Sequence, residues 1–441
     1  MVLAHTNAAV EELAKRTSDL RYLVKITTLD ALSLQLISPY AEAFNLPVPI
    51  RPGDGSGRVP YARLSLHAAE LLRRCPIVAC MLAAMYPIII LDEHQDASEN
   101  QHAIAMALRS AGSLVRAFGD PMQAIFGEDT ISWDDVCSDA DQCAELAIAH
   151  RWRDDPALGE WILRARESLK RGLPLPLNDA PSAVRVTIVP GGDIRYGTGN
   201  VRDYSRMILA FPQQCAALLT ARKINIDTLR RASSNRATVY EGSALEHLYD
   251  AFDRIIDKIG SPRDLALIVL DLIADTSTGL TAAHRSRIER SLGELRLDPG
   301  RQHVVAPLLA VLRKLYDRPS LPGVAQVARE LRANCPQFLR FYRPAAFQIL
   351  SALTSVGAEP YDQLQEAVSI HKAVTHRPLF AVGTVHRTKG IEYDHVLVFN
   401  VSETHFPNDV YGRRLLYIAI SRCRKSLNIM IPERGRSPLV S

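Results

Sequence analysis

The chain has 441 residues, of which 47% are hydrophobic and 23% charged, and its net charge is +4. These values are typical of a soluble globular protein with room for roughly two to four domains, and any nucleic-acid surface must be local. None of the seven cysteines forms a C-x₂-C pair, which argues against a zinc or iron–sulfur site and favours a reducing cytosol. The longest apolar stretch, residues 77–91, is interrupted by Pro87 and is too short to span a membrane.

Strands and helices are predicted to alternate in the first part of the chain. Strands are expected at residues 1–4 and 22–27, and helices at residues 7–16, 28–40 and 64–86, with a Pro- and Gly-rich loop at 46–63. Thr6 or Asn7 can cap the first helix. The segment is then either an ordinary strand-to-helix turn or a helix N-terminus that binds phosphate. No G-x-x-x-x-G-K-[ST] motif occurs anywhere in the sequence.

An apolar strand at residues 87–91 runs directly into the acidic cluster Asp92-Glu93-His94-Gln95-Asp96. A continuous apolar run predicts a strand covered on both faces, and ligands of open α/β sheets bind at the carboxyl ends of such strands. There Asp92 can hold Mg²⁺, and Glu93 can accept a proton from an attacking water. The alternative is a strand that ends in a solvated acidic turn.

A second strand, at residues 113–118, leads into Gly119-Asp120 and then Gln123 and Phe126. Gln123 can both donate and accept, which suits a γ-phosphate sensor, and Phe126 can stack on a base. Alternatively, Gln123 is an ordinary turn residue and Phe126 is part of the hydrophobic core. Residues 146–153 form a strand-like run that ends in Arg151 and Arg153, which suit either a surface patch or a triphosphate contact.

The remainder of the chain contains a helical block between strand-rich segments. Strands are predicted at residues 184–189 and 215–220, and apolar residues recur at helical spacing between 241 and 372. Further strands are predicted at residues 379–385, 395–399 and 427–431, with a helix at 413–424.

Together these stretches resemble the motifs of the UvrD/Rep-type superfamily 1 DNA helicases, in the family's order. The resemblance rests on these segments: residues 3–16 and Thr28-Leu29-Asp30 (DNA-contact motifs), Asp92 to Asp96 (D-E-x-Q-D), Gly119 to Gly127 (G-D-x-x-Q-x-I-[YF]-G), residues 146–151, Thr384 to Glu392 (T-x-H-x-x-K-G-x-E) and Tyr417 to Cys423 (Y-[VI]-A-x-[TS]-R-[AC]). Each motif alone is a modest signal, but the ordered set is specific.

The resemblance implies an α/β fold with two RecA-like P-loop NTPase-type domains, in which helices flank parallel sheets. The first domain is expected at residues 1–145, with a small insertion at about 40–86. The second is expected at residues 146–240 and 373–441, interrupted by a helical insertion domain at 241–372.

The resemblance also implies the cofactors ATP and Mg²⁺ and a role for each matched residue. The expected catalytic residues are Glu93, Gln95, Gln123, Arg151 and Arg422; the nucleotide ligands are Asp92 (with Mg²⁺), Asp96, Gly390 and Glu392; and the DNA-contact residues are His5, Thr6, Asn7, Thr28, Phe126, Thr384 and His386. Family members move 3′ to 5′ along single-stranded DNA and act at junctions between single and double strands.

The family's Walker A loop lies upstream of the first DNA-contact motif, at which these 441 residues begin. We therefore expect a cytoplasmic ATP-dependent DNA helicase or translocase, of which these 441 residues lack the N-terminal part, and which is impaired in that form. The alternative is a non-hydrolysing DNA-binding or regulatory protein, and a nuclease finds no further acidic constellation to support it. DNA repair, or a protein partner in a repair or phage-defence complex, fits the same motifs.

Overall fold

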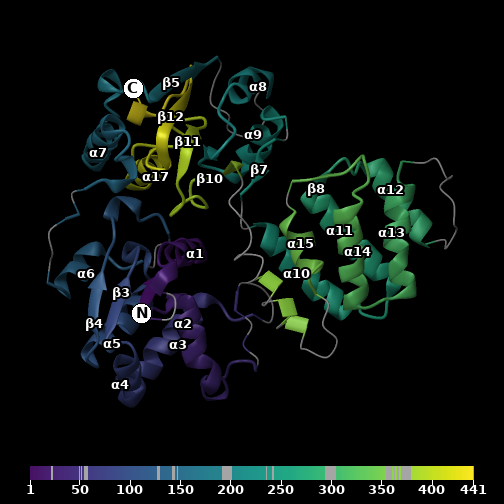
Figure 1. Cartoon of the computed structure of the whole chain (residues 1–441), viewed down its shortest axis with the longest axis horizontal. Helices are drawn as coiled ribbons and strands as arrows, with labels where there is room; N and C mark the ends of the chain where they lie inside the picture. The colour runs from purple at the N-terminus through teal and green to yellow at the C-terminus, as the bar shows by residue number, and fades with distance from the viewer. Residues whose placement is uncertain are drawn as a thin grey trace. The chain divides into compact units, whose positions relative to one another are not determined.

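The computed structural model describes most of the chain. The described residues are 1–20, 23–48, 50, 52–53, 58–126, 130–141, 145–146, 148–190, 201–234, 236–240, 243–293, 304–342, 344–353, 360–361, 363–364, 367–368 and 379–440. By contact, the chain divides into two compact units (Figure 1). The first comprises residues 1–195, 219–221 and 388–441, and the second comprises residues 196–218 and 222–387. The RecA-like domain boundaries expected from the sequence remain a prediction.

The first unit contains a parallel four-stranded sheet of order β2-β1-β3-β4. Its strands are β1 (Val2–Ala4), β2 (Ile26–Thr28), β3 (Ile88–Leu91) and β4 (Leu114–Ala117). Leu3 pairs with Thr27 on one side and with Leu91 on the other, and Leu91 pairs with Ala117. All four strands were predicted from the sequence, and the parallel register brings the carboxyl ends of β1, β3 and β4 to one edge of the sheet.

Helices pack against this sheet through a shared apolar core. The helices of the first unit are α1 (Asn7–Arg16), α2 (Leu29–Ile37), α3 (Tyr61–Arg74), α4 (Pro76–Met85), α5 (Glu99–Ser110), α6 (Trp133–Ser138), α7 (Pro156–Lys170) and α17 (Val410–Ile420). Buried residues of α2, α3 and α5, such as Leu64 and Ile104, form one cluster with Leu3, Ile89 and Leu91 of the strands. Burial of these side chains, at about 25 cal/mol per Å² of apolar surface, fixes the helices on the sheet.

The single helix predicted at residues 64–86 is wrong, because the chain forms α3 and α4 with a break at Cys75. Pro76 follows the break and occupies the first turn of α4. Proline lacks the N–H that would continue α3, and its fixed φ suits the start of a helix. The apolar periodicity of the two helices runs on across the break, which explains the error.

Three further parallel strands of the first unit are β5 (Val184–Val189), β12 (Cys423–Pro432) and β11 (Tyr393–Val398). β12 pairs with β5 and with β11. The helix predicted at 413–424 ends earlier, at Ile420, and β12 begins at Cys423. The prediction that residues 421–424 are helical is therefore wrong. Ser421 caps the end of the helix, and the strand begins one residue after Arg422.

The strand-like run predicted at residues 146–153 is not a strand in its described residues. His150–Trp152 instead form one short 3-10 turn. The turn is held by side-chain bonds: the Trp152 indole Nε1 donates to the Cys423 carbonyl at 2.7 Å, and Arg151 Nη1 donates to the Ser421 carbonyl at 2.7 Å. These tertiary contacts replace the strand pairing that the apolar pattern suggested.

The second unit is mainly helical, as predicted for residues 241–372. Its helices are α8 (Val201–Leu209), α9 (Ile226–Ala232), α10 (Ser243–Asp257), α11 (Pro262–Thr276), α12 (Ala282–Gly293), α13 (Ala306–Asp317), α14 (Leu321–Ala333) and α15 (Ala345–Leu350). Its strands are β7 (Thr238–Val239), β8 (Ser277–Thr278), β9 (Arg340–Phe341) and β10 (Phe380–Thr384), while β6 (Ala216–Thr220) crosses the unit boundary. β10 pairs in parallel with β7.

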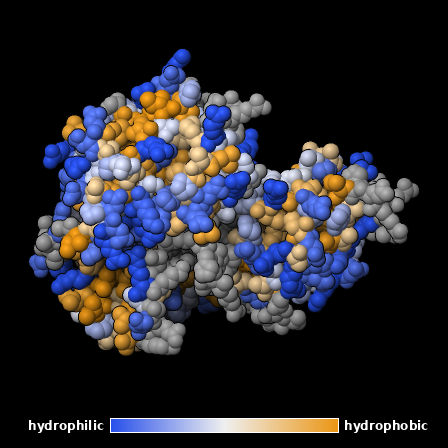
Figure 2. Space-filling model, turned by 45° about the horizontal axis from the view of Figure 1, so that its top comes forward, coloured by the Kyte–Doolittle hydropathy of each residue, from blue (hydrophilic) through white to orange (hydrophobic). Residues whose placement is uncertain are grey.

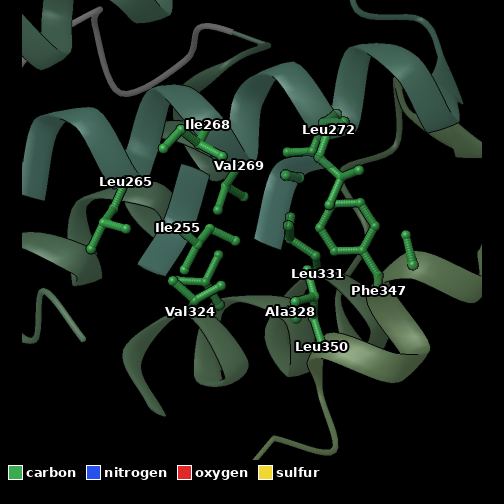
Figure 3. Packing of buried hydrophobic residues seen from close by; sticks show 14 of the residues in the cluster. Ile255, Leu265, Ile268, Val269, Leu272, Val324, Ala328, Leu331, Phe347 and Leu350 are labelled. Carbon is green, nitrogen blue, oxygen red and sulfur yellow. The ribbon is translucent and has the colours of Figure 1, made fainter. Parts of the chain in front are cut away.

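The helices α10 to α15 share one apolar core, part of which is shown in Figure 3. Ile255 of α10, Leu272 of α11, Leu331 of α14 and Phe347 of α15 point into it and are at most 1% exposed. The apolar stripes at helical spacing were predicted as core, and this prediction is confirmed. The α/β fold class, with parallel strands flanked by helices, is confirmed as well.

Apolar residues also lie at the surface of the first unit, on α4. Ile77, Met81 and Met85 are each more than 60% exposed, and Figure 2 shows hydrophobic residues interspersed with hydrophilic ones on the drawn face of the molecule. A groove of about 750 Å³ lies between α3, α4 and α5. It is lined mainly by alanine and leucine side chains and is separate from the polar cluster described next. Among the described helices, none has both the length and the apolar content to cross a bilayer.

Candidate functional site

The acidic turn, residues 92–96, follows β3 and is fixed by backbone bonds to both neighbouring strands. The Asp92 N–H donates to the Leu3 carbonyl at 2.8 Å, and the His94 N–H donates to the Phe118 carbonyl at 2.9 Å. Glu93 adopts the left-handed conformation, with φ 52°. Such a φ is uncommon outside glycine and is held here by the surrounding bonds. His94, Gln95 and Asp96 are buried, whereas Asp92 and Glu93 are half-buried.

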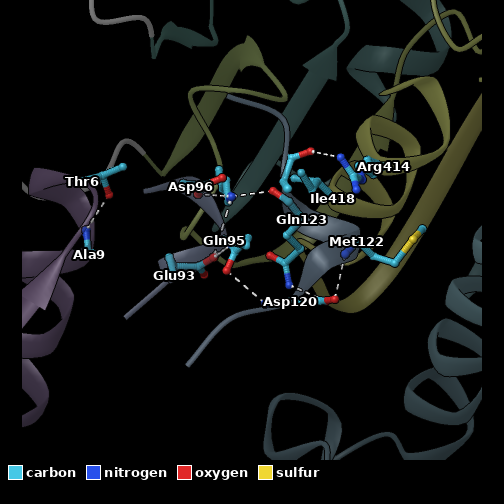
Figure 4. A network of polar contacts seen from close by, with 12 residues as sticks. Thr6, Ala9, Glu93, Gln95, Asp96, Asp120, Met122, Gln123, Arg414 and Ile418 are labelled. Atoms are coloured by element: carbon cyan, nitrogen blue, oxygen red, sulfur yellow. Dashed lines mark hydrogen bonds and ion pairs between the residues drawn. The ribbon is translucent and has the colours of Figure 1, made fainter. Parts of the chain in front are cut away.

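A chain of side-chain hydrogen bonds joins the acidic turn to Gln123 (Figure 4). Gln95 Nε2 donates to Glu93 Oε2, and Gln95 Oε1 accepts from the Asp120 N–H at 3.0 Å. Gln123 Nε2 donates to Asp120 Oδ2 at 3.0 Å. Asp120 is thus the centre of the network, linking the predicted water-activating Glu93 to the predicted γ-phosphate sensor Gln123.

The glycine before Asp120 is required by close packing. A Cβ on Gly119 would lie 2.5 Å from the Trp133 ring and 2.6 Å from Gln95 Oε1. Any larger side chain would displace the amide of Gln95 from the Asp120 N–H. The G-D dipeptide of the motif therefore has a steric explanation in this chain.

Two arginines contact this network: Arg422, just before β12, and Arg151, in the 3-10 turn. Arg422 Nη2 donates to Gln123 Oε1 at 3.1 Å, and Arg422 is 1% exposed. Arg151 Nε lies 2.9 Å from Glu392 Oε1, while its Nη1 donates to the Ser421 carbonyl. Arg422 Nη2 also donates to the Ser421 hydroxyl at 2.9 Å, so both arginines bond to Ser421, and Glu392 provides a counter-charge. The structure brings together all five predicted catalytic residues in one connected set.

Lys389 is a second buried cation of the site, after Arg422, and was not predicted as a site residue. Its Nζ donates to Asp96 Oδ2 and, at 2.5 Å, to the Gln123 carbonyl, and lies 3.8 Å from Glu93 Oε2. Lys389 is 4% exposed and Asp96 is 2% exposed. One ammonium thus links the acidic turn, the turn at Gln123 and the segment that continues to Gly390, whose φ is +77°.

Burial shifts several pKa values in this set. Burial raises the pKa of Asp96 to about 6, although the charge of Lys389 opposes the rise. Burial and then the charge of Glu93 raise the pKa of Asp92. Burial lowers the pKa of Arg422 to about 10, with the Arg151 charge acting in the same direction. Groups with perturbed pKa values cluster at functional sites, and this cluster coincides with the sequence motifs.

The predicted DNA-contact residues fall into three groups. His5 and Phe126 lie together, with ring centroids 5.8 Å apart, and Lys389 Nζ is 5.3 Å from the Phe126 centroid. Thr6 and Thr28 cap helices, since their hydroxyls accept from the N–H groups of Ala9 and Ala31.

The side chain of Asn7 lies outside the described part of the chain, although α1 begins at this residue. Thr384, at the end of β10, and His386 belong to the second unit. Of these two, Thr384 is buried and His386 is half-buried. The DNA-contact role of every residue in this set stays a prediction.

Sequence reasoning missed Asp120, Arg166 and Lys389 as site residues. Arg166 Nη2 donates to Asp120 Oδ1 at 2.8 Å. Burial favours the neutral form of Asp120, but the hydrogen bond and charge of Arg166 outweigh it and lower the pKa of Asp120. Asp120 and Lys389 stand inside the quoted motifs and could have been found there. Arg166 stands in α7, outside every motif, so only the structure reveals it.

Two family models match the chain. The UvrD/REP helicase N-terminal domain matches residues 53–127, and the UvrD-like helicase C-terminal domain matches residues 379–430. Both matched segments contribute to the connected set described above, through Glu93 and Gln123 in one and Lys389 and Arg422 in the other. No curated protein matches the chain at a significant level.

The fold and the site define a parallel α/β protein in which a connected set of polar residues lies at the carboxyl ends of β3 and β4. The two matches confirm the resemblance that the motifs carry: residues 53–127 and 379–430 are similar to the N-terminal and C-terminal domains of UvrD-type helicases, which supports a UvrD/Rep-type superfamily 1 helicase. UvrD-like domains suggest DNA helicase function, DNA as the substrate, and in general the use of ATP and Mg²⁺.

Proposed function

We propose that the chain is an ATP-dependent DNA helicase or translocase that moves 3′ to 5′ on single-stranded DNA and acts at junctions with duplex. The observation that carries this proposal is the continuous set of bonds from Glu93 through Gln95, Asp120 and Gln123 to Arg422. A solvated acidic turn would not be tied to two arginines and a buried lysine. Catalysis of phosphoryl transfer consists largely of positioning and charge stabilisation, which such a set supplies.

Each side chain has a role in this proposal. Glu93 accepts a proton from the attacking water, and Gln95 and Gln123 orient the groups around the γ-phosphate. Arg151 and Arg422 stabilise the charge on the transferred phosphoryl group. The contacts to the nucleotide are assigned to Asp96, Gly390 and Glu392. Of these, Glu392 faces the ribose.

The residues at the acidic turn fit a magnesium ion. The Asp92 carboxylate is half-buried, and its pKa is raised first by burial and then by the charge of Glu93, a repulsion between carboxylates that a cation relieves. Mg²⁺ uses one or two protein carboxylates and takes its other ligands from phosphates and water. Asp92 would hold the ion, which would neutralise the charge on the phosphates of ATP.

Single-stranded DNA would be held by backbone contacts and base stacking, which tolerate any sequence. The proposed contact residues are His5, Thr6, Asn7, Thr28, Phe126, Thr384 and His386. The His5–Phe126 pair supports the stacking part of this proposal, since both rings are placed together beside the acidic turn. We further propose a role in DNA repair in the cytoplasm, with a protein partner in a repair or phage-defence complex.

The deciding experiment is ATP hydrolysis by the 441-residue chain, with and without single-stranded DNA, compared with Glu93→Gln and the control Glu99→Gln. Glu99 is an exposed residue in the first turn of α5, so its charge is removed without touching the site. We expect DNA-stimulated turnover that is weak in the 441-residue chain, rises when a Walker A segment is added in front of residue 1, and falls about 100-fold or more in Glu93→Gln but not in the control. DNA binding without turnover in either form would instead support a non-hydrolysing DNA-binding protein.

The direction of movement needs its own substrate pair. A duplex with a 3′ single-stranded tail and a duplex with a 5′ tail differ only in polarity, so ATP-dependent strand separation of the first alone supports 3′-to-5′ movement. Separation of the 5′-tailed duplex alone would overturn the proposed direction while leaving the proposed hydrolysis intact. A further comparison, with a Walker A segment added in front of residue 1, tests the impairment expected from the sequence.

A further inference from the structure

Asp120 is held by two residues from helices that are distant in the sequence, Arg166 of α7 and Tyr417 of α17. Arg166 Nη2 donates to Asp120 Oδ1 at 2.8 Å, and the Tyr417 hydroxyl hydrogen-bonds the same carboxylate. The two partners also contact each other, since Arg166 Cζ lies 6.0 Å from the centre of the Tyr417 ring. One carboxylate therefore joins three separate segments of the chain.

All three side chains are largely withdrawn from water. Tyr417 is 6% exposed, and the side chains of Arg166 and Asp120 are 18% and 20% exposed. A charge-assisted hydrogen bond is strong where water competes little, so Arg166 is an effective partner for the carboxylate. Burial opposes ionisation, but the hydrogen bond and charge of Arg166 lower the pKa of Asp120, and the carboxylate is ionised at neutral pH.

The ionised carboxylate fixes the orientation of the Gln123 amide. Gln123 Nε2 donates to Asp120 Oδ2 at 3.0 Å, and Gln123 Oε1 accepts from Arg422 Nη2 at 3.1 Å. A carboxylate only accepts and a guanidinium only donates, so exchanging the amide N and O would lose both bonds. The Asp120 N–H also donates to Gln95 Oε1, so the same residue positions both predicted γ-phosphate sensors.

The backbone that carries this amide is held by contacts of its own. Helix α17 packs against the short 3-10 helix Pro121–Gln123 and against α7. Arg414 Nη1 donates to the Ala124 carbonyl at 3.2 Å (Figure 4), and the Met122 N–H donates to Asp120 Oδ1 at 3.0 Å. Loss of the ion pair at Asp120 therefore releases the side-chain amide before it releases the turn.

We propose that Arg166 and Tyr417 are positioning residues for the reaction, which hold Asp120 and through it the Gln123 amide in the orientation that phosphoryl transfer requires. Neither residue acts on the substrate itself. This inference rests on the proposed function, because the amide has a use only if the γ-phosphate of ATP lies before it. Catalysis of phosphoryl transfer depends on groups placed in advance, and displacing such a group by about 1 Å can cost roughly 100-fold in rate.

The first test does not depend on turnover. It is NMR of the full chain labelled with ¹⁵N at the glutamine side chains, with the Gln123 amide assigned by its loss in Gln123→Met. We expect this signal to lie outside the range of exposed glutamines and to move into that range in Arg166→Met. Arg166→Lys keeps one charged donor for Asp120 and should leave the signal in place, as should Arg164→Met, an exposed control on the same helix.

The second test is turnover of ATP by the same variants. We expect Arg166→Met to lower kcat about tenfold or more and to leave the KM for ATP within about twofold, and Arg166→Lys to recover most of the loss. Tyr417→Phe removes a single hydroxyl and serves if the first variant folds poorly. It should lower kcat roughly three- to fivefold, whereas Tyr411→Phe, an exposed tyrosine of the same helix, should not.

A merely structural pair would change the folded fraction but not kcat per folded molecule. An unmoved Gln123 signal in Arg166→Met, or no recovery in Arg166→Lys, would overturn the positioning role. A moved signal with unchanged kcat would overturn its link to hydrolysis. Absence of turnover in the unaltered chain would refute the proposed function, and the NMR signals would still decide whether Arg166 orients the amide.

Discussion

Removing the Lys389 ammonium should destabilise the first unit more than the loss of any surface ion pair. In Lys389→Met the side chain keeps much of its volume, but the Asp96 carboxylate loses its only charged hydrogen-bond partner among the described contacts. Asp96 is 2% exposed, so water does not replace the ammonium. Breaking a buried pair on one side costs about 3 to 5 kcal/mol of unfolding free energy, and we expect a loss in this range at pH 8.

The size of this loss should depend on pH in a defined direction. The pKa of Asp96 is already raised to about 6 by burial, and without Lys389 it should rise further, because the lysine charge opposes the rise. A folded-state pKa above the unfolded one means that the folded protein holds a proton that the unfolded chain releases, so stability falls as pH increases through that interval. The destabilisation by Lys389→Met should therefore be small at pH 5 and large at pH 8.

Urea unfolding at the two pH values measures this effect. The matched control is Lys425→Met, which removes an exposed lysine from its pair with Asp394 and should cost less than about 1 kcal/mol. Adding Asp96→Asn to Lys389→Met should recover part of the stability, because no buried charge remains. Equal stability of Lys389→Met and the unaltered chain at pH 8, or no recovery in the double variant, would refute this reasoning.

Three further outcomes follow from the packing. Gly119→Ala places a Cβ against the Trp133 ring and should cost about 1 to 3 kcal/mol in urea unfolding; unchanged stability would contradict the contact. Arg166→Met removes the cation paired with the half-buried Asp120 carboxylate and should lower kcat for ATP with little change in KM, whereas the exposed Arg164→Met on the same helix should do neither. Phe347→Ala opens a cavity in the helical core and should cost about 3 to 5 kcal/mol in the second unit, and a smaller loss would mean that the core closes around it.

Local signals in the sequence were sufficient for the elements that carry the site. The continuous apolar run before Asp92 predicts β3, and the apolar run before Gly119 predicts β4. The expectation that β3 is covered on both faces is wrong, because Ile88 is 53% exposed while Ile89 is fully buried. Helical spacing predicted the core of α10 to α15. Periodicity failed where a proline divides α3 from α4 and where the chain at Arg151 is held by single side-chain bonds, since neither event changes the apolar pattern.

The sequence by itself determined which residues could do the chemistry, because each motif combines charged or polar side chains in a fixed order that a simple turn does not need. Only the tertiary structure decided how they are connected. Lys389 reaches Asp96 across 293 positions and Arg422 reaches Gln123 across 299, separations over which no local pattern carries information. The contact of His102 Nε2 with Asp139 Oδ2, at 3.0 Å across 37 positions, likewise exists only because folding places the two residues together.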